Sequence, residues 1–123
     1  MIFGNPKEMS AKVISTASAE HYTWGNHCDG WFLVRTPELN IIEELMPPGA
    51  SEARHHHERA RQFFFVLEGE LTMEIERHEF QVKAGEGIEI SPGQQHQAMN
   101  RARVPLRIVV TSQPPSHGDR IDD

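Results

Sequence analysis

The sequence predicts an all-β fold, a small sheet that is closed into a barrel or folded into a jelly roll. Short apolar segments recur along the chain, each the length of a strand and separated from the next by proline or glycine. No window of ten or more residues shows the spacing of an amphipathic helix. A sheet of this size avoids exposed edges best by closing on itself, which favours the barrel or jelly roll.

We expect strands from residue 31 onward, bounded by turn residues such as Pro47, Gly69 and Gly85. Residues 10–17 are mixed in propensity and have no clear period, so we assign them to no element. The expected strands, in chain order, cover residues 31–35, 39–46, 62–68, 70–77, 79–83, 88–91, 96–100 and 106–111.

Two of these strands have contrasting patterns. In the segment 70–77, Leu71, Met73 and Ile75 alternate with polar residues, which predicts a strand with one wet face. Residues 63–67 are apolar at every position, and five residues are too few for a buried helix. We therefore expect that strand to be covered on both faces.

The length of the chain indicates a single domain over residues 1–123. We expect a barrel core at about 31–112, with the segment 1–30 packed on the barrel. Proline lacks the amide donor that a sheet ladder needs, and two prolines follow one another from Pro114. Residues 113–123 should therefore form a C-terminal arm.

The composition excludes several classes of function. The net charge is −6, from 12 basic and 18 acidic residues, so the protein should not bind nucleic acid. No segment approaches the roughly 20 apolar residues of a membrane-spanning helix, and the first residues do not resemble an export signal. The single cysteine, Cys28, agrees with a reducing compartment. We expect a globular cytoplasmic protein.

The histidines indicate a metal site. On an extended chain His55 and His57 point to one face, about 6 to 7 Å apart along the backbone, and His56 points to the other. Further ligands must come from other strands, and Gln62 and His96 are the candidates. Taken alone, the three consecutive histidines favour a solvated polar loop, so the second segment decides for the metal site.

The positions around these residues resemble the cupin family. The first cupin motif is a glycine, five residues, His-x-His, three or four residues, a glutamate, six residues and a glycine. The sequence has Gly49, His55, His57, Gln62 and Gly69 at these positions, with glutamine in place of glutamate. The second motif is a glycine, five residues, Pro-x-Gly, two residues, a histidine, three residues and an asparagine. Its positions are occupied by Gly85, Ser91, Pro92, Gly93, His96 and Asn100, with serine in place of the first proline.

The resemblance implies a double-stranded β-helix, which is a jelly-roll barrel, with one divalent transition metal near an open end. It implies that His55, His57, Gln62 and His96 hold this metal. Phe64 shares the inward parity of Gln62 and would form an apolar wall of the pocket. The identity of the metal stays open among zinc, nickel, iron and manganese.

A neutral glutamine at position 62 has chemical consequences. A divalent ion that is held by three imidazoles and an amide oxygen keeps its full charge and should attract an anionic oxygen. Gln62 cannot serve as a general base. Some cupins with three histidines and one glutamine act on sugar acids. Glu43 and Glu44 fall on opposite faces of one strand, so only one of them could point inward as a base.

Other residues have less specific interpretations. Cys28, His21 and His27 fit no familiar metal spacing, and we expect Cys28 to be a small buried apolar residue. Trp24 and Trp31 could pack on the barrel or line the mouth of the pocket, and packing is the commoner role.

Two hypotheses of function remain. The first is a metal-dependent isomerase, lyase or dioxygenase acting on a small oxygen-rich molecule such as a sugar, a sugar acid or another organic anion. The second is a module that binds a small molecule or a metal without chemistry. The outward parity of Phe63 and Phe65 further predicts a homodimer that covers both rings.

Overall fold

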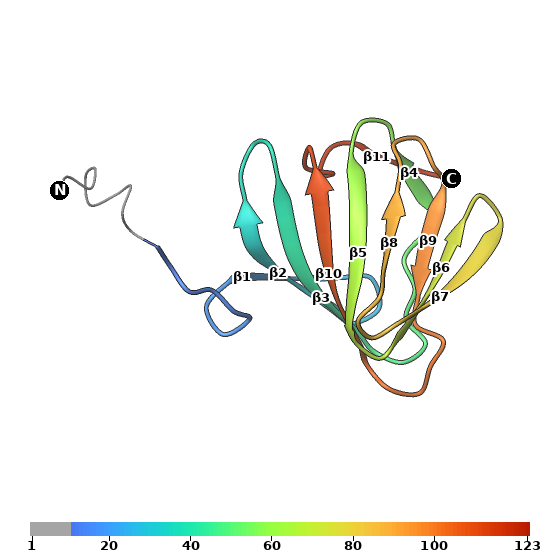
Figure 1. Ribbon diagram of the computed structural model, residues 1–123, viewed down its shortest axis with the longest axis horizontal. Helices are drawn as coiled ribbons and strands as arrows, with labels where there is room; N and C mark the ends of the chain where they lie inside the picture. Colours follow the sequence, from blue (N-terminus) through green and yellow to red (C-terminus); the bar gives the residue numbers. More distant parts are fainter. Residues whose placement is uncertain (1–10) are drawn as a thin grey trace.

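A computed structural model describes residues 11–123 as two antiparallel sheets with no helix among these residues (Figure 1). The larger sheet has the strand order β1-β2-β3-β10-β5-β8, and the smaller has the order β11-β4-β9-β6-β7. The strands are β1 (Glu20–Trp24), β2 (Cys28–Arg35), β3 (Asn40–Met46), β4 (His55–His57), β5 (Arg61–Glu68), β6 (Glu70–Ile75), β7 (His78–Lys83), β8 (Gly87–Ile90), β9 (His96–Met99), β10 (Leu106–Gln113) and β11 (Arg120–Asp122). The predicted all-β class is confirmed.

All eight expected strands are present, with ends that shift by up to three residues, and three further strands were not predicted. β1 and the three-residue strands β4 and β11 are too short or too polar to show a period. β11 lies within the segment that we expected as a C-terminal arm, beyond the two prolines, and pairs with β4. Proline removes a ladder hydrogen bond only at its own position, so the chain can join a sheet again at Arg120, five residues after Pro115.

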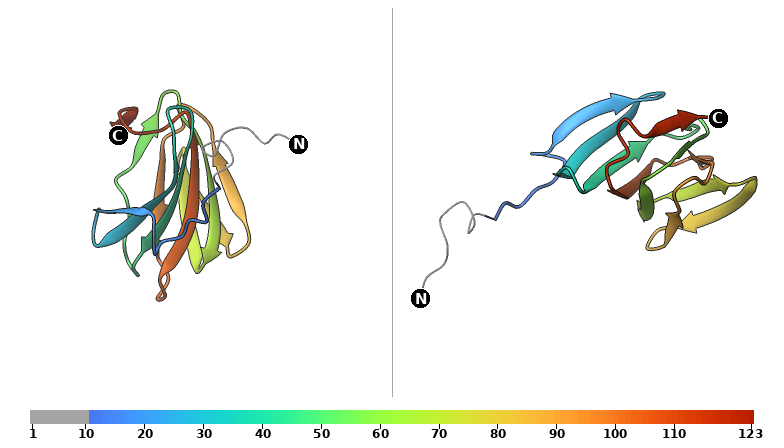
Figure 2. Two further views of the ribbon diagram at one scale, coloured as in Figure 1. Left: turned by 90° about the vertical axis from the view of Figure 1, so that its left-hand side faces the viewer. Right: turned by 90° about the horizontal axis from the view of Figure 1, so that it is seen from above.

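The two sheets enclose one core of buried apolar side chains, and Figure 2 shows the sheets from the side and from above. Inward residues of the larger sheet, such as Phe64, Val66 and Ile108, meet Leu71 and Met73 of the smaller sheet. This alternation follows from the period of two along each strand, since successive side chains point to opposite faces. None of the described residues form a helix that is long and apolar enough to cross a bilayer.

The expectation of one wet face on the strand at 70–77 was wrong. Thr72 is 2% exposed and Glu74 is 9% exposed, so both faces of β6 are covered. The Glu74 carboxylate accepts a hydrogen bond from Arg54 Nε at 2.5 Å, and the Thr72 hydroxyl bonds Gln81 at 2.9 Å. Polar side chains of neighbouring segments therefore bury the face of β6 that carries Thr72 and Glu74, which we had expected to contact solvent because of its polar residues.

The strand at 62–68 is not covered on both faces within the single chain, in contrast to our expectation. Its inward residues are buried, but Phe63, Phe65 and Leu67 are 44%, 37% and 41% exposed. No element of the described chain covers this outer face of β5, because β5 lies in the larger sheet between β10 and β8 with its odd-numbered residues directed outward. The apolar residues on both faces of this strand therefore did not indicate that one face is exposed in the single chain.

Two features of the fold position the candidate site. Strand β4 lies between β9 and β11, and His55 is directly opposite His96 in the register. The hairpin from β5 to β6 turns at Gly69, which has a φ of 85° and no room for a Cβ atom, since one would lie 2.6 Å from the carbonyl oxygen of Pro105. This turn connects the two sheets immediately after the strand that carries Gln62.

Candidate metal centre

Three histidines converge between the sheets. His55 and His57 project inward from β4, and His96 projects inward from β9. The ring centroids of His55 and His96 are 4.4 Å apart, those of His55 and His57 are 4.9 Å apart, and those of His57 and His96 are 5.8 Å apart. One nitrogen from each ring lies within 4.8 Å of the other two. The fold therefore brings together three residues that the sequence separates by up to 41 positions.

Backbone carbonyls determine which nitrogen of each ring faces the centre. Each ring donates its Nδ1 hydrogen to a carbonyl oxygen, because a carbonyl can only accept. The Nε2 atoms are then left without hydrogen and can act as metal ligands. The bonds run from His55 to Ala53 at 2.8 Å, from His57 to Asp119 at 2.8 Å and from His96 to Gln94 at 2.9 Å.

Gln62 presents its amide oxygen to the same region. Its Nε2 donates to the hydroxyl of Ser112 at 3.0 Å, which orients the side chain and leaves Oε1 as the free atom. Oε1 of Gln62 and Nε2 of His96 are both buried and have no hydrogen-bond partner within residues 11–123. Buried polar atoms normally have a hydrogen-bond partner, so we expect these two lone-pair donors to bind a cation. The four residues fit a divalent metal.

The histidines are neutral at physiological pH. Burial lowers the pKa of His55 to about 3, and burial likewise lowers the pKa values of His57 and His96. A metal competes with protons for a ring nitrogen, so a depressed pKa keeps the ligands available at lower pH. The absence of charge also means that the three rings do not repel one another in the metal-free protein.

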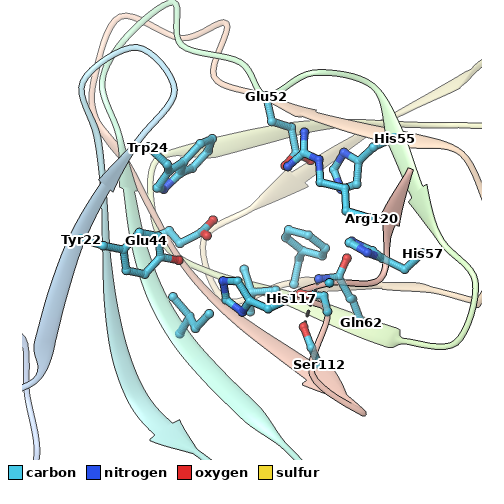
Figure 3. Close-up of a pocket in the computed structure, with 15 residues that line it drawn as sticks. Tyr22, Trp24, Glu44, Glu52, His55, His57, Gln62, Ser112, His117 and Arg120 are labelled. Carbon is cyan, nitrogen blue, oxygen red and sulfur yellow. Dashed lines mark hydrogen bonds between the residues drawn. The ribbon is translucent and has the colours of Figure 1, made fainter. Parts of the chain in front are cut away.

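A cavity of about 270 Å³ opens beside the histidines. Phe64, which is 4% exposed, contributes an apolar part of its wall. Acidic and aromatic side chains line further parts of the wall, on β1, on β3 and on the loop before β4, and the acidic side chain of that loop lies on the side of His55 (Figure 3). Those that concern the chemistry are Tyr22, Trp24, Glu44 and Glu52.

The two neighbouring glutamates of β3 point to opposite faces of the sheet, and only one of them lines the cavity. Glu43 points outward and pairs with Arg107 at 2.5 Å, whereas Glu44 lines the cavity. Burial, together with the nearby carboxyl of Glu52, raises the pKa of Glu44 to about 8. Burial also raises the pKa of Glu52 to about 7, although the amide of Ala98 donates to its Oε1 at 3.0 Å. The cavity thus contains two carboxyl groups that titrate near neutrality.

A family model described as the cupin domain matches residues 42–112, more than half of the chain. The chain belongs to the cupin family. The motif positions of this cupin coincide with the converging side chains, since the first motif supplies His55, His57 and Gln62 and the second supplies His96.

Similarity to curated proteins covers part of this cupin. The uncharacterized protein MJ1618 of Methanocaldococcus jannaschii is 35% identical over 81 residues, which is 65% of this chain and 65% of that protein. The tetracenomycin polyketide synthase protein TcmJ of Streptomyces glaucescens is 29% identical over 69 residues, 56% of this chain and 46% of that protein. The match thus spans less than two thirds of each relative's length.

Solved structures extend the similarity to the fold. The structure of KdgF from Halomonas sp. has a TM-score of 0.78 to this cupin, at 17% identity, and the match covers 87% of this chain and 98% of that one. The predicted double-stranded β-helix is confirmed by this likeness together with the two-sheet topology.

Sequence reasoning missed the contribution of the C-terminal segment. His117 and Arg120 line the cavity, and Asp119 holds His57 through its carbonyl oxygen. None of them belongs to a motif or to an apolar period, so only their clustering after the last long strand could have drawn attention to them. Arg120 is the one arginine or lysine at the wall of the cavity within the described chain.

The remaining candidate residues do not belong to the histidine cluster. Cys28 is fully buried, as expected of a small apolar residue, while His21 bonds Asp29 at 2.7 Å. Within residues 11–123 the histidine triad is the only group of three or more such side chains able to share a metal. His56 lies on the opposite face of β4 and bonds the carboxylate of Asp123 at 2.9 Å. Trp24 lines the cavity.

Proposed function

We propose that this cupin is a metal-dependent enzyme that acts on a small organic anion rich in oxygen, such as a sugar acid. One observation carries the proposal. Three unprotonated imidazole nitrogens and the free amide oxygen of Gln62 meet at one side of a cavity whose remaining wall carries ionisable groups. A site with metal ligands and nearby acid–base groups is what polar chemistry on a bound substrate requires.

The proposed ligands are His55, His57, Gln62 and His96, and the proposed metal is one of zinc, nickel, iron or manganese. A bound divalent ion would polarise an oxygen atom of the substrate. Because all four ligands are neutral, the site retains the full positive charge and favours an anionic substrate oxygen. Phe64 would give this side of the cavity an apolar wall.

The proposed substrate class follows from the size and charge of the cavity. A volume of about 270 Å³ accommodates a molecule smaller than the usual drug-sized ligand. Arg120 is placed to pair with a carboxylate, since a guanidinium matches the geometry of that group. Glu44 and Glu52 can bond the hydroxyl groups of the same molecule.

The metal centre is tested by elemental analysis of protein that is purified without a histidine tag. We expect about one equivalent of a divalent transition metal in the wild type and a large loss in His57→Ala. His56→Ala is the matched control, since this neighbouring ring faces away from the cavity, and it should retain the metal.

The substrate class is tested by thermal shift with sugar acids and simple organic acids on the metal-loaded protein. Stabilisation by carboxylates, lost in His57→Ala, is the expected result. Unchanged metal content and unchanged ligand affinity in His57→Ala would contradict the proposal. Ligand binding without turnover of any acid would instead favour the binding module.

We further propose that the protein is a homodimer formed through the outer face of β5. Phe63, Phe65 and Leu67 form an exposed apolar row on the larger sheet, one strand from its β8 edge, where water contact is unfavourable. Phe63 packs over Gly87 of the adjacent strand, where a Cβ atom would lie 2.3 Å from the ring, so the row presents a broad surface to a partner. A second copy would bury the same row symmetrically.

A further inference from the structure

We propose that Glu44 is the catalytic acid–base residue of the pocket, and that Tyr22 is a positioning residue paired with it on the cavity wall. This inference rests on the proposed function, because it concerns the chemistry of the substrate that the metal centre holds. It adds a reaction class, isomerisation by proton transfer next to a carbonyl group. It also assigns a role to three residues outside the cupin motifs: Tyr22, Gly30 and Glu44.

The pair is built by one row of residues across three strands. Tyr22 of β1 is directly opposite Gly30 of β2, and Gly30 is directly opposite Glu44 of β3. Residues that are opposite one another in adjacent strands point to the same face of a sheet. Tyr22 and Glu44 therefore face the cavity from two strands that are not neighbours, with β2 between them.

Gly30 allows the two side chains to meet. A Cβ atom at this position would lie 2.3 Å from the ζ carbon of Tyr22 and 2.6 Å from its phenol oxygen. The ring of Tyr22 thus lies across the backbone of β2, in the space that any other side chain would fill. The phenol reaches the Glu44 carboxyl, and the two groups lie next to each other beside the cavity (Figure 3).

The backbone conformation at position 30 does not itself require a glycine, because its φ is not positive. The glycines of the described chain with positive φ are at other positions, in turns, whereas Gly30 is in the middle of a strand. A glycine inside a strand weakens it and commonly marks the close approach of another group. Here the approaching group is the only tyrosine in the sequence, and it lies against a carboxyl group in the cavity.

The surroundings of Glu44 suit proton transfer. Tyr22 on β1, Cys28 on β2, Glu52 before β4 and Arg120 on β11 are the ionisable groups that act on it or respond to its charge. Burial first, then the carboxyl of Glu52, raises its pKa to about 8, while Tyr22 and Arg120 lower it. A general base works best with a pKa near the operating pH. Tyr22 stays protonated, because burial and the charge of Glu44 raise its own pKa.

The proposed step is balanced without an oxidant or a reductant. The Glu44 carboxylate takes a proton from a substrate carbon next to a carbonyl group. The C–H bond breaks, an O–H bond forms on Glu44, and the electron pair moves to the carbonyl oxygen of the substrate. In a substrate whose deprotonated carbon also carries a hydroxyl group, the hydroxyl proton moves to the new oxyanion and a C=O bond forms at that carbon. Glu44 returns its proton to the former carbonyl carbon, which completes the isomerisation. Tyr22 lies beside the carboxylate and releases no proton.

The pairing is tested by the near-ultraviolet titration of Tyr22, which as the only tyrosine gives an unmixed signal. In the wild type we expect ionisation well above the ordinary pKa of tyrosine. Glu44→Gln removes the adjacent charge and should lower this pKa, whereas the control Glu43→Gln, on the outer face, should leave it unchanged. An identical Tyr22 titration in Glu44→Gln and the wild type would overturn the pairing.

Gly30→Ala tests the geometry without removing either group. A methyl group here displaces the phenol from Glu44, so the Tyr22 pKa should move in the same direction as in Glu44→Gln. Circular dichroism establishes whether this variant folds. If it does not, Tyr22→Phe replaces it, with the Glu44 pKa followed by carboxyl infrared absorption. An unchanged Glu44 pKa in Tyr22→Phe would count against the pair.

The catalytic role is tested by deuterium exchange from heavy water into pyruvate and D-glucuronate, followed by NMR with the zinc-loaded protein. We expect the wild type to introduce deuterium next to the carbonyl group of at least one probe. Glu44→Gln should reduce the rate at least about 100-fold, within the usual range for a lost general base, and retain its zinc. Zinc-loaded wild type that exchanges neither probe, or Glu44→Gln that exchanges normally, would overturn the inference while leaving the metal centre intact. Loss of zinc from the wild type would instead refute the proposed function.

Discussion

The backbone carbonyl of Asp119 accepts a hydrogen bond from Nδ1 of His57 at 2.8 Å, across 62 positions of sequence. The carboxylate of the same residue accepts three more, from the backbone amides of Glu58 at 3.1 Å, Arg59 at 3.0 Å and Ala60 at 2.9 Å. Asp119 thus holds both the ring of His57 and the turn that follows it. Burial raises the pKa of Asp119, but the three amides outweigh burial and hold it below its ordinary value.

Replacement of Asp119 by alanine should weaken metal binding. The turn after His57 loses the carboxylate that accepts three amide hydrogen bonds, so the ring is held less firmly with Nε2 toward the centre. We expect a loss of affinity of about 10–100-fold, as for other residues that orient metal ligands. Competition with a chromogenic chelator measures this loss. Asp119→Asn keeps one acceptor oxygen and should be intermediate, whereas equal affinities for the alanine variant and the wild type would show that the turn holds its shape unaided.

Removal of the metal should destabilise the wild type and should not affect a variant that lacks one of the metal ligands, such as His96→Ala. A ligand that binds only the folded state stabilises it by about 2.7 kcal/mol at 100 times its Kd. Chelation should therefore lower the melting temperature of the wild type measured by calorimetry. His96→Ala should show no such change, while His78→Ala, an exposed ring on β7, should behave as the wild type. A chelator effect of the same size in His96→Ala would place the metal elsewhere.

Glu44 should make the stability of the metal-free protein depend on pH. Its pKa rises from 4.5 to about 8 on folding, so the folded chain binds this proton more tightly than the unfolded chain does. The resulting stabilisation is complete below pH 4.5 and is lost as the pH rises to about 8, by at most about 1.4 kcal/mol per pH unit. Urea denaturation at several pH values checks this. The stability of the wild type relative to Glu44→Gln should fall over that range, and a constant difference would contradict the prediction.

Charged residues on the outer face of β5 should prevent dimerisation. The double variant Phe63→Lys, Phe65→Lys places two like charges in the proposed interface, where the symmetry axis brings them near their copies. Light scattering after size exclusion should give the mass of a dimer for the wild type and of a monomer for the variant. Phe80→Lys, at an exposed position on β7 of the smaller sheet, is the control and should stay dimeric. A monomeric wild type at micromolar concentration would refute the interface.

Several features of this cupin could be predicted from the sequence because they depend on local pattern. The alternation of apolar residues predicts strands, since a strand has a period of two. The two spaced motifs predict which of the eight histidines could meet, since His55 and His57 share a face of any extended chain. Gly69 predicts a turn because glycine readily adopts the backbone conformations that tight turns require. These predictions require no knowledge of which strands are neighbours.

The tertiary structure decided what depends on contacts between distant segments. The choice between Glu43 and Glu44 as the inward carboxyl required the position of β3 in the larger sheet. The covering of Thr72 and Glu74 required Arg54 and Gln81, and the support of His57 required Asp119. A polar side chain is directed by the partner that satisfies it, and that partner can lie anywhere in the chain.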